Sequence, residues 1–229
     1  MVVRLQNKDG MAMRFLDRRD AGRRLAKKLA GYADDPRVVV LGLPRGGVPV
    51  AYEVAQALHA PLDVFVVRKL GVPGHRELAM GAIASGGARV LNQDVIDALR
   101  ISSAEVESVA DREVQEVERQ QRLYRGHVPL PELRGRTVIV VDDGLATGST
   151  MRAAVGALRH SKPARIIVAA PVAAEETART LREVADGVVC LSAPVDFHAV
   201  SMWYEDFSQT SDEEVRNLLE AASRAAFSL

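Results

Sequence analysis

The sequence predicts an α/β fold in which a doubly wound, mainly parallel sheet is flanked by helices. Short, continuous runs of β-branched and apolar residues predict strands at 37–43, 62–68, 137–143, 164–170 and 187–191. Segments with helical periodicity alternate with these runs, and strands buried on both faces are typical of parallel sheets. No repeat or obvious linker divides the 229 residues. We therefore expect a single domain over 1–229, with a core at about 37–192.

Helices are predicted between the strands and near both ends of the chain. Asp17 is a candidate N-cap for the first helix, and Ser211 followed by Glu214 is a capping-box pattern for the last. The longest helix has an apolar stripe with which it is expected to cover the sheet. The predicted helices span 17–32, 46–59, 93–100, 103–124, 148–160, 174–184 and about 211–224, and a further short strand is predicted at 88–92.

Segment 69–87 interrupts this alternation. It contains five glycines and shows no clean period. A glycine-rich connection of this length is expected to be irregular, either as a functional lid or as a disordered segment.

Composition limits the kinds of partner. Thirty basic and thirty acidic residues give a formal net charge of zero, so nothing attracts the whole chain to nucleic acid or to an anionic membrane. No apolar run reaches the roughly 18 residues that a membrane span needs. The single cysteine, Cys190, fits a reducing compartment and is expected to fill core space. We expect a cytoplasmic protein that binds a small molecule, and neither nucleic acid nor a membrane.

The string VIVVDDGLATGST at 138–150 places two adjacent acids, Asp142 and Asp143, at the exit of a buried strand. Paired carboxylates can accept hydrogen bonds from a vicinal diol and can hold the hydration shell of a divalent cation. The loop at 146–150 then opens a helix, whose free amides and hydroxyls suit a phosphate. The string predicts a ribose 5-phosphate site. A plain turn, with solvated acids and Ser149 as a helix cap, is the structural alternative.

A second string, LGLPRGGVPVA at 41–51, also joins a buried strand to a helix. Arg45 supplies one cation, and Gly46 and Gly47 supply two unhindered amides, a combination that suits a pyrophosphate. An ordinary strand–turn–helix connection with an exposed arginine is the alternative for this string taken alone.

The first string resembles the phosphoribosyl-pyrophosphate signature of the type I phosphoribosyltransferases, which is a hydrophobic strand, two acids, two variable residues and A/D-T-G-x-T. By this resemblance Asp142 and Asp143 bind the ribose hydroxyls and, through these hydroxyls or water, hold Mg²⁺. The resemblance also implies a type I phosphoribosyltransferase-like fold with a small hood from loop and terminal segments. The residues that it assigns to the 5-phosphate are Ala146, Thr147, Gly148, Ser149 and Thr150.

LPRGG is similar to the pyrophosphate loop of the same family, so Arg45, Gly46 and Gly47 are expected pyrophosphate ligands. The family often has a cis, non-proline peptide bond there, which predicts a cis Pro44–Arg45 bond. Two positions depart from the pattern. Ala146 stands where some purine-salvage members carry an aspartate that contacts the base, and Gly144 replaces a more usual bulky aliphatic residue.

The loop VRKLGVPGHRELAMGA at 67–82 lies where related enzymes carry a mobile catalytic loop. Arg68 and Lys69 are the expected pyrophosphate contacts there, and Glu77 or His75 the expected proton-transfer group. The hood is expected at about 193–229, with Phe197 stacked on the acceptor base. The alternative is that the aromatic residues of this tail only pack the last helix onto the sheet.

The resemblance implies a phosphoribosyltransferase that transfers the 5-phosphoribosyl group of phosphoribosyl pyrophosphate to a nitrogenous base. Its partners would be that substrate, Mg²⁺ and a small base, and a homodimer is compatible with the sequence. Two alternatives remain open: a non-catalytic regulator that binds phosphoribosyl pyrophosphate or a nucleotide, and a sugar-phosphate hydrolase. The expected catalytic residues are Arg45, Lys69, Glu77 and Asp143.

Overall fold

A five-stranded parallel sheet forms the centre of the molecule, in the order β2-β1-β6-β7-β8. The structure is a computed structural model, and it describes residues 14–126 and 128–226. The strands of this sheet are β1 (Val38–Gly42), β2 (Leu62–Val64), β6 (Thr137–Val141), β7 (Arg165–Val172) and β8 (Gly187–Ser192). The parallel sheet confirms the predicted fold class, and it makes β1 and β6 direct neighbours.

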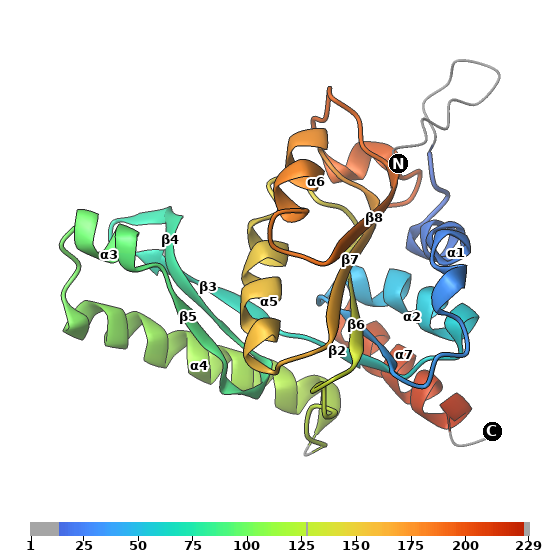
Figure 1. Cartoon of the computed structure of the whole chain (residues 1–229), viewed down its shortest axis with the longest axis horizontal. Coiled ribbons are helices and arrows are strands. Elements are labelled where there is room, and N and C mark those ends of the chain that lie inside the picture. Colours follow the sequence, from blue (N-terminus) through green and yellow to red (C-terminus); the bar gives the residue numbers. More distant parts are fainter. Residues whose placement is uncertain (1–13, 127, 227–229) are drawn as a thin grey trace.

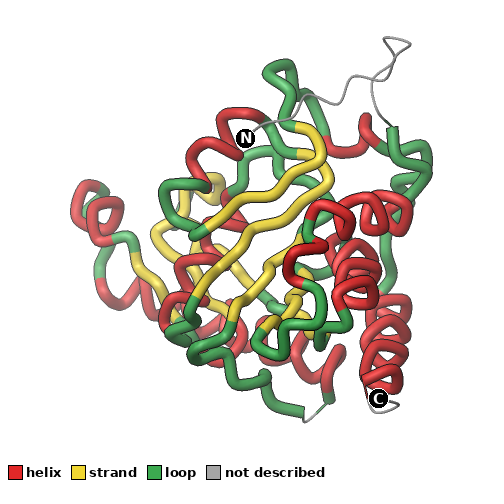
Figure 2. The backbone as a smooth tube through the Cα atoms, turned by 45° about the vertical axis from the view of Figure 1, so that its right-hand side comes forward, coloured by secondary structure: helices red, strands yellow, loops and turns green. Residues whose placement is uncertain are grey.

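Helices cover both faces of this sheet, as the strand layer in Figure 2 shows. Helices α1 (Arg18–Lys28) and α2 (Gly47–Leu58) pack on one face, and α5 (Ser149–His160) and α6 (Glu175–Leu181) on the other. Successive strand residues alternate between the two cores: Val38 and Val40 face α1 and α2, whereas Val39 faces α5. Burial on both faces explains why the strands appear in the sequence as unbroken apolar runs.

A second unit projects from one side of the sheet as an arm (Figure 1). Its three antiparallel strands are β3 (Val67–Val72), β4 (His75–Ala84) and β5 (Arg89–Leu91). Helices α3 (Gln93–Ala98) and α4 (Ser103–Arg125) complete the arm, and α4 confirms the predicted long helix. Short 3₁₀ helices follow α1 as η1 (Ala30–Tyr32), β4 as η2 (Ser85–Gly87) and β8 as η3 (Val200–Trp203).

The expectation that segment 69–87 is irregular was wrong, because most of it pairs as β3 and β4. The strand predicted at 62–68 is correspondingly divided between β2 and β3. Leu70 and Met80 are fully buried against the arm helices, so the hairpin has a real apolar face. Gly71 lies at a shift in the pairing register. At Gly81 a Cβ would overlap the carbonyl oxygen of Val90. These glycines serve close strand pairing, and they also hid the strand pattern.

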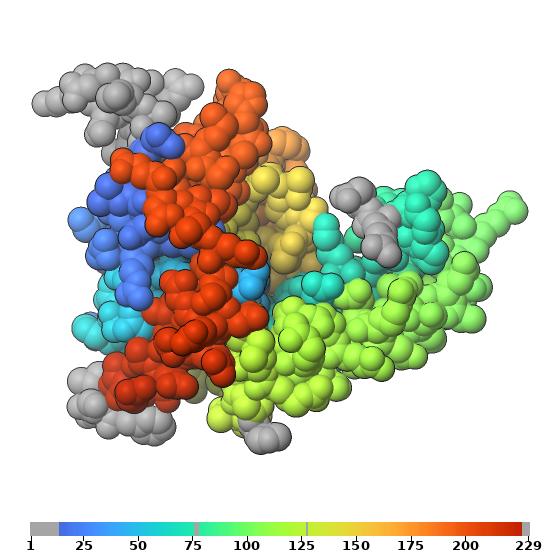
Figure 3. All heavy atoms as spheres, turned by 180° about the vertical axis from the view of Figure 1, so that it is seen from behind, coloured from blue at the N-terminus to red at the C-terminus, as the bar shows by residue number. Residues whose placement is uncertain are grey.

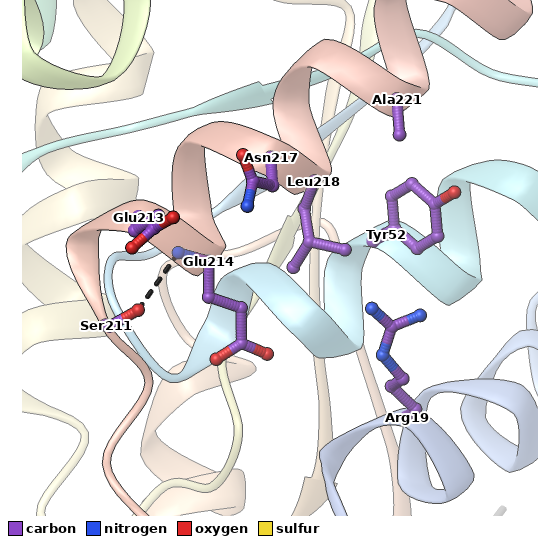
Figure 4. Close-up of a pocket in the computed structure, with 8 residues that line it drawn as sticks. All are labelled: Arg19, Tyr52, Ser211, Glu213, Glu214, Asn217, Leu218 and Ala221. Atoms are coloured by element: carbon purple, nitrogen blue, oxygen red, sulfur yellow. Dashed lines mark hydrogen bonds between the residues drawn. The ribbon is translucent and has the colours of Figure 1, made fainter.

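The last helix, α7 (Asp212–Ala226), packs against α2 and α4. In the view of Figure 3 it lies between the N-terminal region and the green helix of the arm, and the surface is hollowed between arm and core. Ser211 caps it as predicted, because its Oγ accepts the amide hydrogen of Glu214 at 3.0 Å (Figure 4). Within the described ranges, every helix is too short or too polar to cross a lipid bilayer.

Candidate functional site

The two loop motifs lie side by side because they leave neighbouring parallel strands at the same edge. Gly42 at the end of β1 is paired with Val141 at the end of β6. After β1 the backbone continues through the Pro44–Arg45 peptide bond, which is cis as predicted. After β6 it continues through Asp142 and Asp143. The carboxyl ends of parallel strands are where open α/β sheets bind their ligands.

Gly46 and Gly47 let these two loops pack directly on each other. A Cβ at Gly46 would overlap Oδ2 of Asp143, and a Cβ at Gly47 would lie 2.6 Å from the carbonyl oxygen of Val141 and 2.9 Å from Cα of Asp142. Gly46 has an ordinary helical φ of −60°. The glycines are therefore required for space rather than for an unusual backbone conformation.

The two acids share a shielded environment. Oδ1 of Asp142 accepts the amide hydrogen of Asp143 at 2.9 Å. Burial raises the pKa of Asp142 well above its usual range, and the neighbouring Asp143 charge raises it further. Burial also raises the pKa of Asp143, against the opposing effect of Arg18. Two adjacent carboxyl groups held in this way cost stability, which a cation or a hydroxyl-bearing ligand offsets.

Arg18 at the start of α1 is the cation at this acid pair. Its Nε lies 2.8 Å from Oδ2 of Asp143, and its side chain is only 12% exposed. Its Nη1 donates to the carbonyl oxygen of Ser208 at 2.7 Å, and its guanidinium lies 4.0 Å from the ring centroid of Phe207. The sequence analysis missed Arg18, because it is one of several basic residues on the first helix and no local pattern distinguishes it.

The loop at 146–150 has the geometry of a helix start open to solvent. Gly148 is left-handed, with φ of 66°, and precedes α5. Thr147 Oγ1 lies 3.1 Å from Ser149 Oγ, which places two hydroxyls together. Thr177 of α6 supports the loop from behind, because its Oγ1 donates to the carbonyl of Ala146 at 2.5 Å. Ala146, Thr147 and Thr150 are exposed, so the free amides of α5 can meet an anion.

The arm brings its cations to this loop. Arg68, Lys69 and Thr150 line one cavity of about 430 Å³, which extends to α4. Lys69 and Ser149 also line a second cavity of about 250 Å³. Arg68 is paired with Glu113 of α4, with 2.8 Å between Nε and Oε2. Both predicted pyrophosphate contacts, Arg68 and Lys69, therefore lie beside the expected phosphate loop.

Arg45 points toward the last helix. Its Nη1 is 3.9 Å from Oδ1 of Asp212, and its side chain is 36% exposed. The same oxygen of Asp212 accepts a hydrogen bond from the hydroxyl of Tyr124 at 2.6 Å. Asp212 was not anticipated, and it links the expected pyrophosphate loop to both α4 and α7.

The roles of two further residues stay predictions. Glu77 belongs to β4, and its side chain lies outside the described part of the structure. Phe197 is half-buried in the loop after β8, and its role at the base stays a prediction. The aromatic residue found at the acids is Tyr204, whose hydroxyl donates to the carbonyl of Asp143 at 2.5 Å. Tyr204 is buried against Phe15.

The acid pair is a sparse donor set for a metal. Among the residues that the structure describes, no cluster of three or more histidine, cysteine, aspartate or glutamate side chains is placed to hold an ion. One oxygen of Asp142 is occupied by an amide and one of Asp143 by Arg18. This arrangement fits a divalent cation held mainly through ligand oxygens or water, and not one held by protein alone.

Comparison with known proteins identifies the family of this chain. The sequence profile of the phosphoribosyl transferase domain matches residues 15–205. Two proteins of Mycobacterium tuberculosis, Rv0571c and MT0597, each bear the name "Putative phosphoribosyl transferase" and are 47% identical to this chain over 211 residues. The match covers 92% of this chain and 47% of each relative, so the chain spans about half the length of the curated relatives it matches.

A solved structure is also similar to most of this chain. The crystal structure of TT1426 from Thermus thermophilus is 44% identical and superposes with a TM-score of 0.81, over 90% of this chain and 98% of that one. The matched family region contains Arg18, both loop motifs and Tyr204. The chain therefore belongs to the phosphoribosyl transferase domain family.

Proposed function

We propose that this chain is a phosphoribosyltransferase that moves the 5-phosphoribosyl group of phosphoribosyl pyrophosphate onto a nitrogenous base and releases pyrophosphate. The observation that carries the proposal is the direct packing of Gly46 against Asp143. It joins a loop suited to pyrophosphate with acids suited to ribose hydroxyls. The loop suited to the 5-phosphate follows those acids without a break.

Each part of the substrate has a matching group. Asp142 and Asp143 would accept hydrogen bonds from the ribose hydroxyls, and the amides and hydroxyls at 146–150 would hold the 5-phosphate. Arg45, with the amides of Gly46 and Gly47, would hold the pyrophosphate, and Arg68 and Lys69 would approach it from the arm. The cavities shared by Lys69 and the phosphate loop support this arrangement.

The reaction would break the bond between the anomeric carbon and the pyrophosphate oxygen. Positive charge develops on the sugar as negative charge develops on the leaving group, and fixed cations such as Arg45 and Lys69 stabilise that charge. Mg²⁺, bound through oxygens of the substrate, would add Lewis-acid stabilisation of the same leaving group. A nitrogen of the acceptor would then form the new bond to the anomeric carbon. Glu77 stays our prediction for removal of the acceptor's proton.

The experiment is a pyrophosphate-release assay with phosphoribosyl pyrophosphate, Mg²⁺ and a panel of purine and pyrimidine bases. We expect release that depends on one of the bases, together with formation of the matching nucleotide. Release without any base would identify a hydrolase. Tight binding without turnover for every base would instead identify a regulatory binding protein.

A matched pair of variants connects this activity to the site. Asp143→Asn removes the charge of an acid in the proposed site, whereas Asp94→Asn removes that of an exposed acid on α3 of the arm. We expect the first to weaken binding of phosphoribosyl pyrophosphate by at least about tenfold, because a charged hydrogen-bond acceptor is lost. The second should bind like wild type. Equal affinities for the two variants would remove Asp143 from the site.

A further inference from the structure

Arg18 contacts the acid pair in a way that fixes one of its carboxylates. A single guanidinium N–H, on Nε, meets Oδ2 of Asp143 at 2.8 Å, and that carboxylate is 15% exposed. Gly46 lies against the same oxygen. Oδ2 is therefore enclosed between a cation and a backbone, and these two contacts set the direction of the carboxylate.

The guanidinium itself is held by the tail of the chain. Nη1 donates to the carbonyl oxygen of Ser208, and the ring of Phe207 lies 4.0 Å from the guanidinium carbon. A planar guanidinium that stacks on a ring and donates at two nitrogens has little freedom to rotate. The hydroxyl of Tyr204 also donates a hydrogen bond to the backbone carbonyl of Asp143. Asp143 is thus fixed at both its side chain and its backbone.

We propose that Arg18 is a positioning residue, which aims Asp143 at a ribose hydroxyl and so gives the site its selectivity for a hydroxylated sugar phosphate. The inference rests on the proposed function, because it assumes that the acids receive the ribose. It goes further by assigning to the first helix and to residues 207–208 a part in sugar recognition. Arg18 acts through Asp143 and does not itself touch the sugar.

Recognition of the phosphate is an internal reference for the effect of Arg18 on recognition of the hydroxyls. The loop at 146–150 is supported by Thr177 of α6, not by Arg18. Loss of Arg18 should therefore weaken recognition of the hydroxyls and leave recognition of the phosphate intact. A purely structural role would instead weaken the binding of any sugar phosphate to the same extent.

The test uses isothermal titration calorimetry with two probes, ribose 5-phosphate and 2,3-dideoxyribose 5-phosphate. The full chain is compared with Arg18→Gln and with Arg18→Lys, which keeps the charge but cannot donate from two nitrogens of one plane. Arg19→Gln is the matched control. Arg19 is the neighbouring residue, with a comparable ion pair to Glu53 at 3.5 Å and a ring contact to Tyr52 at 5.7 Å. It lines the pocket of Figure 4, which Arg18 does not line, although both arginines also line a smaller pocket beside the tail.

We expect wild type and Arg19→Gln to prefer ribose 5-phosphate by at least about tenfold, the value of hydrogen bonds to a charged acceptor. In Arg18→Gln the preference should fall to about threefold or less, through weaker binding of ribose 5-phosphate alone. Arg18→Lys should recover part of the preference. If Arg18→Gln does not fold, Arg18→Lys still decides the question, because its preference should lie measurably below that of wild type.

Two contrary results have different meanings. A wild-type preference that persists in both Arg18 variants would overturn the positioning role and leave the proposed function untouched. Wild-type protein that binds both sugars equally, or neither, would overturn the proposed function together with this inference.

Discussion

Gly46 provides the space that the carboxylate of Asp143 occupies: a Cβ at position 46 would overlap Oδ2 of Asp143. The two residues come from loops about a hundred positions apart in the sequence. Their contact places the expected pyrophosphate site against the expected ribose site. A methyl group added at position 46 would therefore have to displace the carboxylate of Asp143.

Gly46→Ala should therefore displace a side chain of the proposed site without straining the backbone. The backbone at Gly46 is helical, so alanine is conformationally acceptable, and the cost arises from displacing an ion-paired carboxylate. We expect affinity for ribose 5-phosphate to fall by at least about tenfold and the free energy of unfolding by about 1–3 kcal/mol. Calorimetry and urea denaturation measure the two effects.

Gly31→Ala is the control, because a Cβ there meets nothing within 4 Å. It should leave both ligand affinity and stability close to wild type. Normal affinity in Gly46→Ala would show that Asp143 can move aside without loss, and the close approach would then have no functional meaning.

Val200 explains the unusual glycine in the signature string. A Cβ at Gly144 would overlap the Cγ atoms of Val200, so the tail supplies the aliphatic group that other family members are expected to carry at this position. Gly144→Ala should lower the free energy of unfolding by about 1–3 kcal/mol through overpacking. Combining it with Val200→Ala should recover part of that loss. A double-mutant cycle from urea denaturation should give a coupling energy of at least about 0.5 kcal/mol. A strictly additive cycle would contradict the contact.

Much of the fold could be predicted because its signals are local. A parallel strand buried on both faces is an unbroken apolar run, and the strands at 37–43 and 137–143 were found in this way. Their pairing as neighbours follows from topology, and once they are neighbours the two loop motifs must converge. The family resemblance assigned both motifs to one site, and the pairing of β1 with β6 brings them together.

Segment 69–87 and Arg18 show where such reasoning fails. In the hairpin, glycines are selected by close strand pairing, as at Gly81, and the alternation of apolar residues is lost. Arg18 lies 125 positions from Asp143 in sequence, and no local pattern separates it from the other basic residues of its helix. Ion pairs formed by tertiary packing have no signature in a single sequence.

The two adjacent acids should respond to neutralisation to different extents. Burial raises the pKa of Asp142 above its unfolded value, so its stabilising contribution belongs to the protonated form and is lost as pH rises through the folded pKa. Asp142→Asn resembles that protonated form and should raise the free energy of unfolding at pH 8 by about 1–2 kcal/mol, or the Tm by about 2–8 °C. It should also weaken binding of ribose 5-phosphate.

Asp143→Asn should raise the free energy of unfolding by less than Asp142→Asn does, because Arg18 favours the ionised form of Asp143 and opposes the effect of burial on its pKa. Differential scanning calorimetry of the two variants at one pH gives the comparison directly. A larger increase in Asp143→Asn than in Asp142→Asn would contradict the different environments of the two carboxyl groups.

Asp63, which lies away from the site, should make the free energy of unfolding depend on pH. It lies in β2 with a side chain 13% exposed, and its Oδ1 is 3.5 Å from Nε of Arg125 at the end of α4. Burial raises the pKa of Asp63 to about 6, although Arg125 opposes the shift. The ion pair is long, so the cost of removing the carboxylate from water exceeds the attraction between the charges.

The sign of the effect follows from the raised pKa. The folded state holds the proton of Asp63 more tightly than the unfolded state, whose pKa is near 3.8. The resulting stability is complete below about pH 4 and is lost as pH rises toward 6, at up to about 1.4 kcal/mol per pH unit. Asp63→Asn has no such titration. The free energy of unfolding of wild type minus that of Asp63→Asn should therefore decrease from pH 4 to pH 6.5, then level off.

Urea denaturation of both proteins across this range measures the difference. A difference that increases with pH would mean that Arg125 stabilises the carboxylate more than burial penalises it. The contact between β2 and α4 would then act as a favourable ion pair that holds the arm to the sheet, and not as a buried acid retained at a cost.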